Sequence, residues 1–402
     1  MSTFSFNATI SFTIAIAVLF LGLAILKRVK LLAKYHIPAP IIGGIVVALL
    51  TTACHLHGID LVFDLPLKTT LMLMFFASVG YSANLALLRH GGKVLFAFLF
   101  CATLFIVFQD VVGLALAKVL NLDPMLGLLA GSITLSGGHG TGAAWASIFA
   151  EQFHIDDALE IAMACATFGL VVGGIFGGPL GKKLIQNNEL ASFDETEHSK
   201  YIPKQQRHGQ TKGISPAKWL TSGALLLVSS LCAQQLHQLL SSYELFKFVP
   251  NFVYAIALGV IVGNISGIQK ALDKSRSELN QVGNLTLGLF LSMALMELKL
   301  WNLLDLALPL LAILMAQILF TLLFVYWVTF RVMGRSYDAA VMSAGHVGFG
   351  MGATPTAMMN LNAITSHYGP STQAYFVVPL VGAFFIDIVN LAIIQTYIAL
   401  LN

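Results

Sequence analysis

Long apolar segments recur along almost the whole chain, and they restrict its fold more than any other feature of the sequence. A helix that crosses a bilayer needs about 20 mostly apolar residues. Inside lipid, every backbone polar group must be bonded within the protein, so only helices and closed barrels can span. We therefore predict an all-α polytopic membrane protein with ten transmembrane helices. The predicted spans are about 8–26, 37–54, 69–88, 94–117, 158–181, 217–239, 248–265, 283–300, 306–330 and 374–400.

The charge content excludes a water-soluble fold of this size. Charged residues make up 10% of the chain, against about 25% in soluble domains. The four cysteines lie in apolar runs without a CxxC pair, which is typical of small buried hydrophobes rather than of a metal or redox site. Because the basic residues follow the loops and form no patch, nucleic acid is not an expected partner.

Two further apolar regions, about 125–149 and 338–365, contain glycine at positions where a membrane helix normally has bulky apolar side chains. The first holds Ser136-Gly137-Gly138-His139-Gly140-Thr141-Gly142, and the second runs from Ser343-Ala344-Gly345-His346 to Thr354-Pro355-Thr356. Glycine-interrupted segments at corresponding places in two halves of a chain point to the binding site of a secondary transporter. Irregular backbone at membrane depth must be packed in protein or line a cavity. We predict a re-entrant hairpin in each region.

The polar segment 184–216 divides the chain into two similar halves, 1–183 and 217–402. Each half holds five predicted spans and one hairpin, and an odd number of spans inverts the second half in the membrane. Sequence echoes support a repeat: Ile37-Pro38 and Val249-Pro250 each open a span, and both glycine stretches begin Ser-x-Gly-His. We predict two inverted-topology repeats of five helices joined by a cytoplasmic linker.

The distribution of lysine and arginine sets the orientation, because cytoplasmic loops carry an excess of both. With the N-terminus outside and each hairpin returning to its own side, nearly all of the 22 basic residues fall on one side. The exceptions are Lys68, Lys118, Lys247 and Lys299. Both termini are therefore predicted on the outer, periplasmic side of the membrane, and the linker on the cytoplasmic side.

The glycine stretches suit a carboxylate ligand. A broken helix exposes free N–H groups that carry a partial positive charge, and glycine lets the backbone approach a ligand closely. Hydroxyl groups nearby can bind a carboxylate or a small cation, and free carbonyls suit Na⁺ rather than a soft metal. The candidate substrate-binding residues are Ser136, Gly137, Gly138, Gly140, Thr141, Gly142, Gly345, Gly348, Gly350, Gly352, Thr354 and Thr356. The alternative is that glycine only allows helices to pack closely, which is our interpretation of Gly43-Gly44 and Gly173-Gly174.

Carboxylates inside predicted spans are functional candidates, because a charge at membrane depth is costly. Asp387 is the strongest, and with Asn390 one turn further on it could hold a cation or the amino group of a substrate. Asp110 is the second candidate, and either carboxylate could instead be a buried structural acceptor. Glu160 and Glu297 lie near span ends and are interpreted as interfacial.

Two histidines recur in the glycine stretches. His139 and His346 are interpreted as hydrogen-bonding struts at the hairpin tips, with a role as proton carriers as the alternative.

At these motifs the sequence resembles the bacterial sodium/glutamate symporter family over nearly the whole chain outside the linker. The segments that carry the resemblance are 130–145, 162–169, 350–357 and 378–390. It implies a carrier of the bacterial inner membrane that couples L-glutamate uptake to Na⁺ entry, without another cofactor. It also implies a homodimer, an elevator-like movement, and ligand-binding re-entrant motifs at 136–142 and 345–352.

Other functions remain open from the residues alone. One is a carrier of another amino acid or dicarboxylate, coupled to protons or to Na⁺, and another is a channel. An intramembrane enzyme is disfavoured, because no catalytic Ser/His/Asp spacing, HExxH motif or paired carboxylates stand out.

Overall fold

The chain forms a mostly helical membrane protein in a computed structural model that describes residues 2–30, 32, 37–83, 92–190, 215–241, 243, 249–299 and 306–401. The first half contains β1 (Ser2–Phe6), α1 (Ala8–Arg28), α3 (Ala39–Leu56), β2 (Ile59–Phe63), α4 (Lys68–Ser82), α6 (Gly92–Val119), α7 (Pro124–Leu128), the π-helical turn η1 (Leu129–Ile133), α8 (Gly138–Phe153) and α9 (Ala158–Asn187).

The second half contains α10 (Pro216–Leu240), α11 (Asn251–Gly263), α12 (Ser266–Asp273), α13 (Arg276–Met296), α14 (Ala307–Phe324), the π-helical turn η5 (Val325–Thr329), α15 (Phe330–Val332), α16 (Tyr337–Gly350), α17 (Thr354–Tyr368), α18 (Thr372–Leu380), the π-helical turn η6 (Val381–Phe385) and α19 (Ile386–Leu401). Every predicted span contains a helix.

Seven helices in the described part of the chain are long and apolar enough to cross a membrane. They are α1, α3, α6, α9, α10, α13 and the continuous run from α14 to α15. The remaining predicted spans correspond to shorter or interrupted helices. Helix α4 has 15 residues and α11 has 13, while the last span is divided into α18, η6 and α19, with Pro379 inside α18.

The structure differs from the sequence prediction at two places. A two-stranded parallel sheet pairs Ser2 with Ile59 and Phe6 with Phe63, so the chain is not all-α. Helix α9 also extends to Asn187, beyond the predicted start of the linker, because Leu184 and Ile185 are still buried against neighbouring helices. Most of the predicted linker, 191–214, lies outside the described residues.

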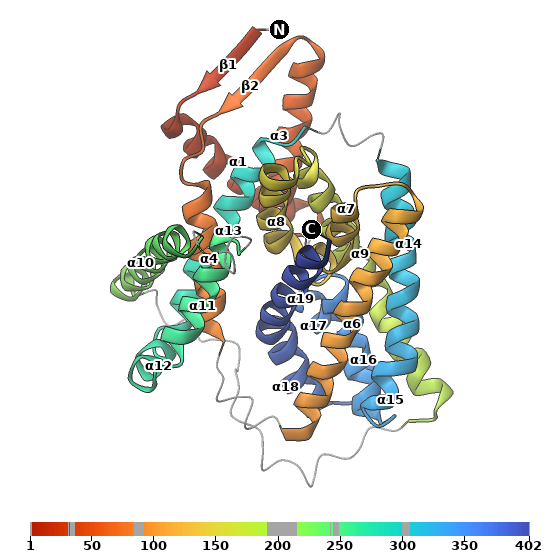
Figure 1. Ribbon diagram of the computed structural model, residues 1–402. Helices are drawn as coiled ribbons and strands as arrows, with labels where there is room; N and C mark the ends of the chain where they lie inside the picture. The colour runs from red at the N-terminus through yellow and green to blue at the C-terminus, as the bar shows by residue number, and fades with distance from the viewer. Residues whose placement is uncertain are drawn as a thin grey trace.

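The helices form two bundles side by side (Figure 1). The six-helix bundle consists of α1, α3 and α4 from the first half and α10, α11 and α13 from the second. The broken-helix bundle consists of α6 to α9 and α14 to α19. Each bundle thus takes helices from both halves of the chain.

Small residues let helices of the six-helix bundle pack at very short distance. A Cβ added to Gly43 of α3 would lie 2.0 Å from the carbonyl oxygen of Val18 in α1. This confirms the interpretation of Gly43 as a packing residue, since only glycine allows such backbone contact.

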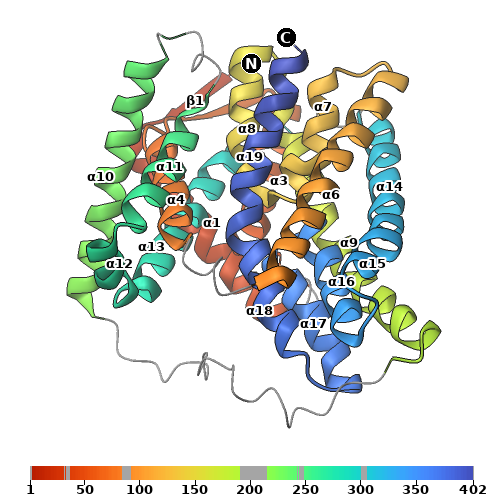
Figure 2. The ribbon, with the colours of Figure 1, turned by 60° about the horizontal axis from the view of Figure 1, so that its bottom comes forward.

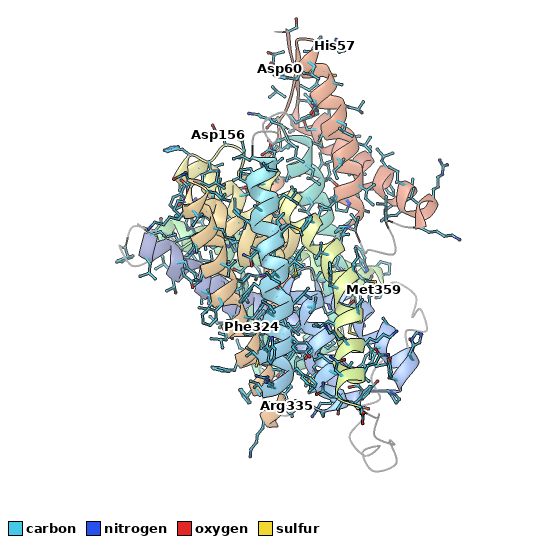
Figure 3. All side chains as sticks on the ribbon, turned by 90° about the vertical axis from the view of Figure 1, so that its right-hand side faces the viewer. His57, Asp60, Asp156, Phe324, Arg335 and Met359 are labelled. Atoms are coloured by element: carbon cyan, nitrogen blue, oxygen red, sulfur yellow. The ribbon has the colours of Figure 1, made fainter. Side chains whose placement is uncertain are left out.

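Both termini lie toward one end of the molecule, as do α7 and α8, whereas α16 and α17 lie toward the other end (Figure 2). His57, Asp60 and Asp156 also lie toward the end with the N-terminus, and Arg335 lies at the opposite end (Figure 3). Between these ends, the described helices bury bulky side chains such as Leu73, Phe98 and Trp145 against one another, while others such as Phe20, Leu50 and Phe100 stay exposed.

Candidate functional site

The first break in the broken-helix bundle runs from Gly131, inside η1, to the start of α8. Gly131 leaves helical geometry, with φ −103° and ψ −134°. Helix α8 then starts at Gly138, whose φ of +69° is in the region that favours glycine. Because α8 starts here, the N–H groups of its first turn lack helical partners.

Asp110 of α6 holds this break in place. Its Oδ1 accepts a hydrogen bond of 2.8 Å from the Ser132 backbone N–H, and its Oδ2 accepts one of 2.9 Å from the Ser132 hydroxyl. A Cβ added to Gly131 would lie 2.8 Å from Asp110 Oδ1, so glycine is needed for this approach. The fully buried carboxylate replaces a helical acceptor for the N–H group that the break leaves free.

The second break lies between α16 and α17. Helix α16 ends at Gly350 and α17 begins at Thr354, followed by Pro355, which suits the first turn of a helix. The Thr354 hydroxyl donates to the carbonyl of Gly382 in η6 at 2.9 Å. The Thr356 hydroxyl is buried without a hydrogen-bond partner among the described residues.

The two breaks meet in the middle of the bundle. A Cβ added to Gly138 would lie 3.6 Å from the carbonyl oxygen of Gly352. The carbonyl of Gly350 accepts a hydrogen bond of 3.0 Å from Gln109 Nε2 of α6. The Ser136 hydroxyl lies 2.8 Å from Gln109 Oε1 and 3.2 Å from the Gly350 carbonyl oxygen. Gln109 and Ser136 thus join the first tip to the second.

Asp387 and Asn390 lie on α19 beside the first break. Asn390 Nδ2 donates to the Ser132 carbonyl at 3.0 Å, and its Oδ1 is buried with no partner in the described part of the chain. Asp387, one turn earlier, has no hydrogen bond or ion pair with any described residue. These unused oxygens could bind a hard cation, which prefers carboxylate and amide oxygens over nitrogen or sulfur.

The two histidines tie helices together. His139 Nε2 lies 3.0 Å from the Thr167 hydroxyl of α9. His346 Nδ1 lies 2.9 Å from the Thr329 hydroxyl of η5, and its ring stacks on Phe349 with centroids 4.9 Å apart.

The Ser-x-Gly-His echo does not mark equivalent positions, which corrects the sequence interpretation. Ser136 and His139 flank the start of α8, at the end of the first break, whereas Ser343 and His346 lie inside α16, before the second break. The helices that follow the two breaks, α8 and α17, begin at Gly138 and Thr354. The number of residues between these two starts is larger than the number between the two Ser-x-Gly-His motifs.

The candidate glycines fall into two groups. Gly137, Gly138 and Gly352 lie at the tips, and the end of α16 supplies Gly350. Within helices, a Cβ on Gly345 would lie 2.6 Å from Leu361 of α17, and one on Gly348 2.4 Å from the Ala357 Cα. Inside α8, Gly140 faces Phe75 and Leu287 of the six-helix bundle, Gly142 faces Thr134, and Thr141 lies one turn from Gly137. The structure therefore brings together only part of the candidate set.

Three further buried polar residues of the bundle, Ser132, Gln317 and Asn360, were not among the residues predicted from the sequence. Gln317 Nε2 donates to the Gln109 carbonyl at 2.8 Å. Asn360 Nδ2 lies 3.0 Å from the Gly173 carbonyl and 3.2 Å from the Ala344 carbonyl, and so joins α17 to α9 and α16. Each is a fully or almost fully buried polar residue. For Gln317 and Asn360, an amide side chain within a mostly apolar segment was the available signal in the sequence.

We expect Gln109→Leu to weaken the binding of the transported solute and the coupling ion by about tenfold. The substitution leaves the Gly350 carbonyl and the Ser136 hydroxyl with fewer hydrogen-bond partners, at a cost of about 1–3 kcal/mol. Apparent affinities for transported solute and coupling ion, measured on purified protein in liposomes, would test this. Ser366→Ala, which removes an exposed hydroxyl on α17, is the control. Unchanged affinities in Gln109→Leu would show that the bridge between the tips is dispensable.

Two interrupted helices that meet at a buried polar cluster in a multi-pass membrane protein define a secondary transporter. Comparison with known proteins identifies the family. The sodium/glutamate symporter family matches residues 4–370, and the chain belongs to it. This is a family of symporters, not of enzymes.

Similar proteins span the whole chain. It is 45% identical over 389 residues to a sodium/glutamate symporter of Escherichia coli (strain K12), covering 95% of each chain. It is 42% identical over 402 residues to one of Haemophilus influenzae, covering 100% of this chain and 99% of that one. A solved sodium proton antiporter from Methanocaldococcus jannaschii has a TM-score of 0.36 at 13% identity, over 97% of this chain and 98% of that one.

Proposed function

We propose that this protein carries L-glutamate into the cell together with Na⁺ across the bacterial inner membrane. The observation that carries the proposal is the meeting of the two tips, at Gly138 and Gly352, beside the unused oxygens of Asp387 and Asn390. Its relatives at 42–45% identity are named sodium/glutamate symporters, which supports the choice of solute and ion.

The substrate carboxylates bind at the tips in this proposal. Two helices, α8 and α17, begin there, and each contributes free N–H groups and the positive end of its dipole. The hydroxyls of Ser136, Thr354 and Thr356 extend the same surface. Two helix N-termini at one point suit a dicarboxylate better than a monocarboxylate.

Na⁺ binds beside α19 in this proposal. Asp387 supplies negative charge and Asn390 Oδ1 supplies a neutral oxygen, while Asp110 acts through Ser132, which it shares with Asn390. A cation here holds the first break in the geometry that receives the substrate. Binding of Na⁺ thereby raises the affinity for substrate, which is what coupled transport requires.

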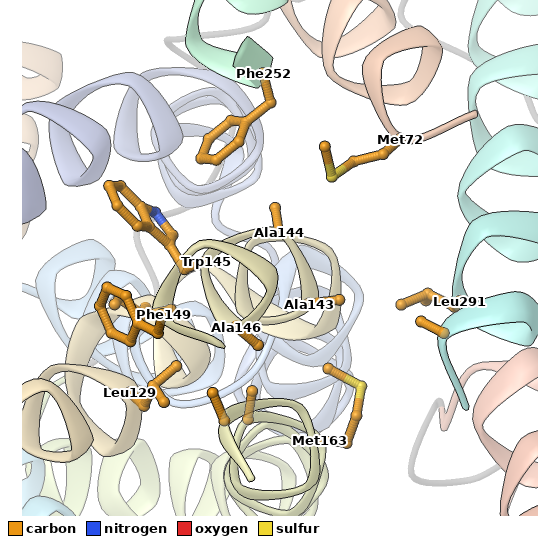
Figure 4. Packing of buried hydrophobic residues seen from close by; sticks show 14 of the residues in the cluster. Met72, Leu129, Ala143, Ala144, Trp145, Ala146, Phe149, Met163, Phe252 and Leu291 are labelled. Atoms are coloured by element: carbon orange, nitrogen blue, oxygen red, sulfur yellow. The ribbon is translucent and has the colours of Figure 1, made fainter. Parts of the chain in front are cut away.

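The movement that exposes the site alternately is a displacement of the broken-helix bundle against the six-helix bundle. Contacts between the bundles are largely apolar, with Trp145 of α8 packed on Phe252 of α11 at 5.6 Å between ring centroids (Figure 4). Apolar contacts are non-directional, so the two surfaces can slide without breaking many hydrogen bonds. An elevator-like cycle follows, in a homodimer whose six-helix bundles stay fixed.

The proposed topology has ten spans and two re-entrant hairpins in two inverted repeats, with both termini periplasmic and the linker cytoplasmic. We expect Glu151→Cys, at the end of α8, to react with an impermeant thiol reagent from the periplasm. His367→Cys, at the end of α17, should react from the cytoplasm. Both positions are exposed, and the background replaces Cys54 and Cys232 by Ala. Labelling of both from one side would mean that a hairpin crosses the membrane.

Uptake of radiolabelled L-glutamate into proteoliposomes tests the function itself. We expect saturable uptake that needs an inward Na⁺ gradient and persists when the pH gradient is collapsed. Uptake that follows a proton gradient in choline would assign the carrier to proton coupling instead. Flux that does not saturate would assign the protein to channels.

A further inference from the structure

A buried carboxylate links the two bundles at the end that carries the N-terminus. Glu160 lies in the first turn of α9, in the broken-helix bundle, and is only 5% exposed. Its Oε1 accepts a hydrogen bond of 2.6 Å from the Lys299 backbone N–H. Its Oε2 is buried without a hydrogen-bond partner among the described residues. Glu160 is therefore not an interfacial side chain exposed to solvent, as its place near a span end indicated.

The donor belongs to the six-helix bundle. Lys299 follows α13, and the two residues before it are fixed to that bundle. Glu297 pairs with Lys68 of α4 at 2.5 Å, and the Leu298 N–H bonds to the carbonyl of Leu295. The bond from Lys299 to Glu160 therefore crosses from one bundle to the other, just before the chain continues to α14.

This bond differs in kind from the apolar contacts elsewhere between the two bundles. Gly140 against Phe75 and Leu287 can tolerate a small shift, because apolar contact depends weakly on direction. A hydrogen bond requires its donor and acceptor within about 3.2 Å and nearly in line. A displacement of α9 relative to α13 by a few ångströms would therefore break the bond while much of the apolar contact between the bundles remained.

The start of helix α9 offsets part of the cost of burying the Glu160 carboxylate when the Lys299 donor is absent. A carboxylate in the first turn of a helix is stabilised by the free N–H groups and the helix dipole. The carboxylate thus remains in place while the Lys299 donor comes and goes. The hydrogen bond between Glu160 and Lys299 therefore depends on the position of the other bundle. A contact that favours one arrangement of the bundles must have this property.

We propose that Glu160 is a positioning residue of the transport cycle, which favours the arrangement of the bundles seen here by accepting the Lys299 N–H across their interface. This inference rests on the proposed movement of one bundle against the other. A hydrogen bond to a charged group changes such an equilibrium by about tenfold or more.

Distances between spin labels on the two bundles test the proposal in the full-length protein in nanodiscs. The labels are attached at Leu56→Cys, at the end of α3, and Val119→Cys, at the end of α6, which are 75% and 73% exposed. Cys54 and Cys232 are replaced by Ala, and labelled chains are diluted with unlabelled chains. The measured quantity is the ratio of molecules with the label distance of this structure to molecules with other distances. We expect Glu160→Ala to reduce this ratio about tenfold. Glu160→Gln should reduce it less, because the amide oxygen still accepts the hydrogen bond.

Matched variants distinguish the effect of losing the Glu160 carboxylate from the effect of losing any charged side chain at this end of the molecule. Glu151→Ala removes an exposed carboxylate at the same end of the molecule and should leave the distances unchanged. Lys299→Ala keeps the backbone donor and removes only an exposed charge near Glu160, so it should shift them much less than Glu160→Ala. An identical distribution in Glu160→Ala and the parent protein would overturn the proposal, as would an equal shift in Lys299→Ala. Neither result depends on glutamate uptake, so failure of the proposed function would appear separately in the liposome assay.

Discussion

Asp387→Asn is expected to abolish Na⁺-stimulated glutamate uptake while the protein still inserts and folds. The carboxylate lies on α19 one turn before Asn390 and has no hydrogen bond or ion pair with any described residue. An amide of the same size removes the charge that would balance Na⁺. Removing one partner of a buried charge pair costs about 3–5 kcal/mol, which is a loss of about a hundredfold or more in Na⁺ affinity.

Uptake at increasing Na⁺ concentration measures this loss. Asp156→Asn, in the loop between α8 and α9, is a control that removes an exposed carboxylate beyond the end of α8 opposite Gly138. Asn390→Ala should give a smaller loss, because it removes a neutral oxygen and one hydrogen bond to Ser132. Na⁺ dependence like that of the parent protein in Asp387→Asn would remove Asp387 from the ion site.

The membrane spans could be predicted from the sequence because their cause is local. Length and apolar composition decide whether a segment can cross a bilayer, and α6, predicted at 94–117, forms at Gly92–Val119. The strand pair could not be predicted in this way. Strand β1 pairs with β2 across more than fifty residues, and its stability depends on contacts such as the stacking of Phe6 on Phe63.

The position of the breaks could be predicted only approximately, because their cause is tertiary. The sequence shows a glycine-rich region around 136–142, yet the chain leaves helical geometry at Gly131. Asp110, on a different helix, decides this by accepting both hydrogen bonds from Ser132. The sequence identified Asp110 as an unusual buried charge but contained no signal for its partner.

Contacts between helices also distinguish glycines that face a ligand from glycines that allow close packing. Both kinds look alike in an apolar sequence, and sequence analysis grouped Gly348 with Gly352. In the structure Gly348 lies inside α16 against the backbone of α17, whereas Gly352 lies at the tip beside Gly138. The consequences of substitution should therefore differ.

We expect Gly348→Ala to destabilise the protein even without substrate or Na⁺. The new Cβ would lie 2.4 Å from the Ala357 Cα and 2.5 Å from its backbone nitrogen, and backbone cannot rotate away as a side chain can. Overpacking of this kind costs about 1–3 kcal/mol or more. Helices α16 and α17 would separate, and the second tip would leave the first.

Thermal unfolding of the ligand-free protein in detergent distinguishes packing from binding. Gly178→Ala on α9 is the matched control, because its new Cβ would meet only the Ala363 Cβ at 3.7 Å, an ordinary contact distance. We expect a lower unfolding temperature and at least tenfold slower uptake in Gly348→Ala, with both unchanged in Gly178→Ala. If Gly348→Ala instead keeps the ligand-free unfolding temperature and loses only the stabilisation by glutamate, Gly348 contacts the substrate. The close approach of α16 to α17 would then have to relax without cost, against the close packing of protein interiors.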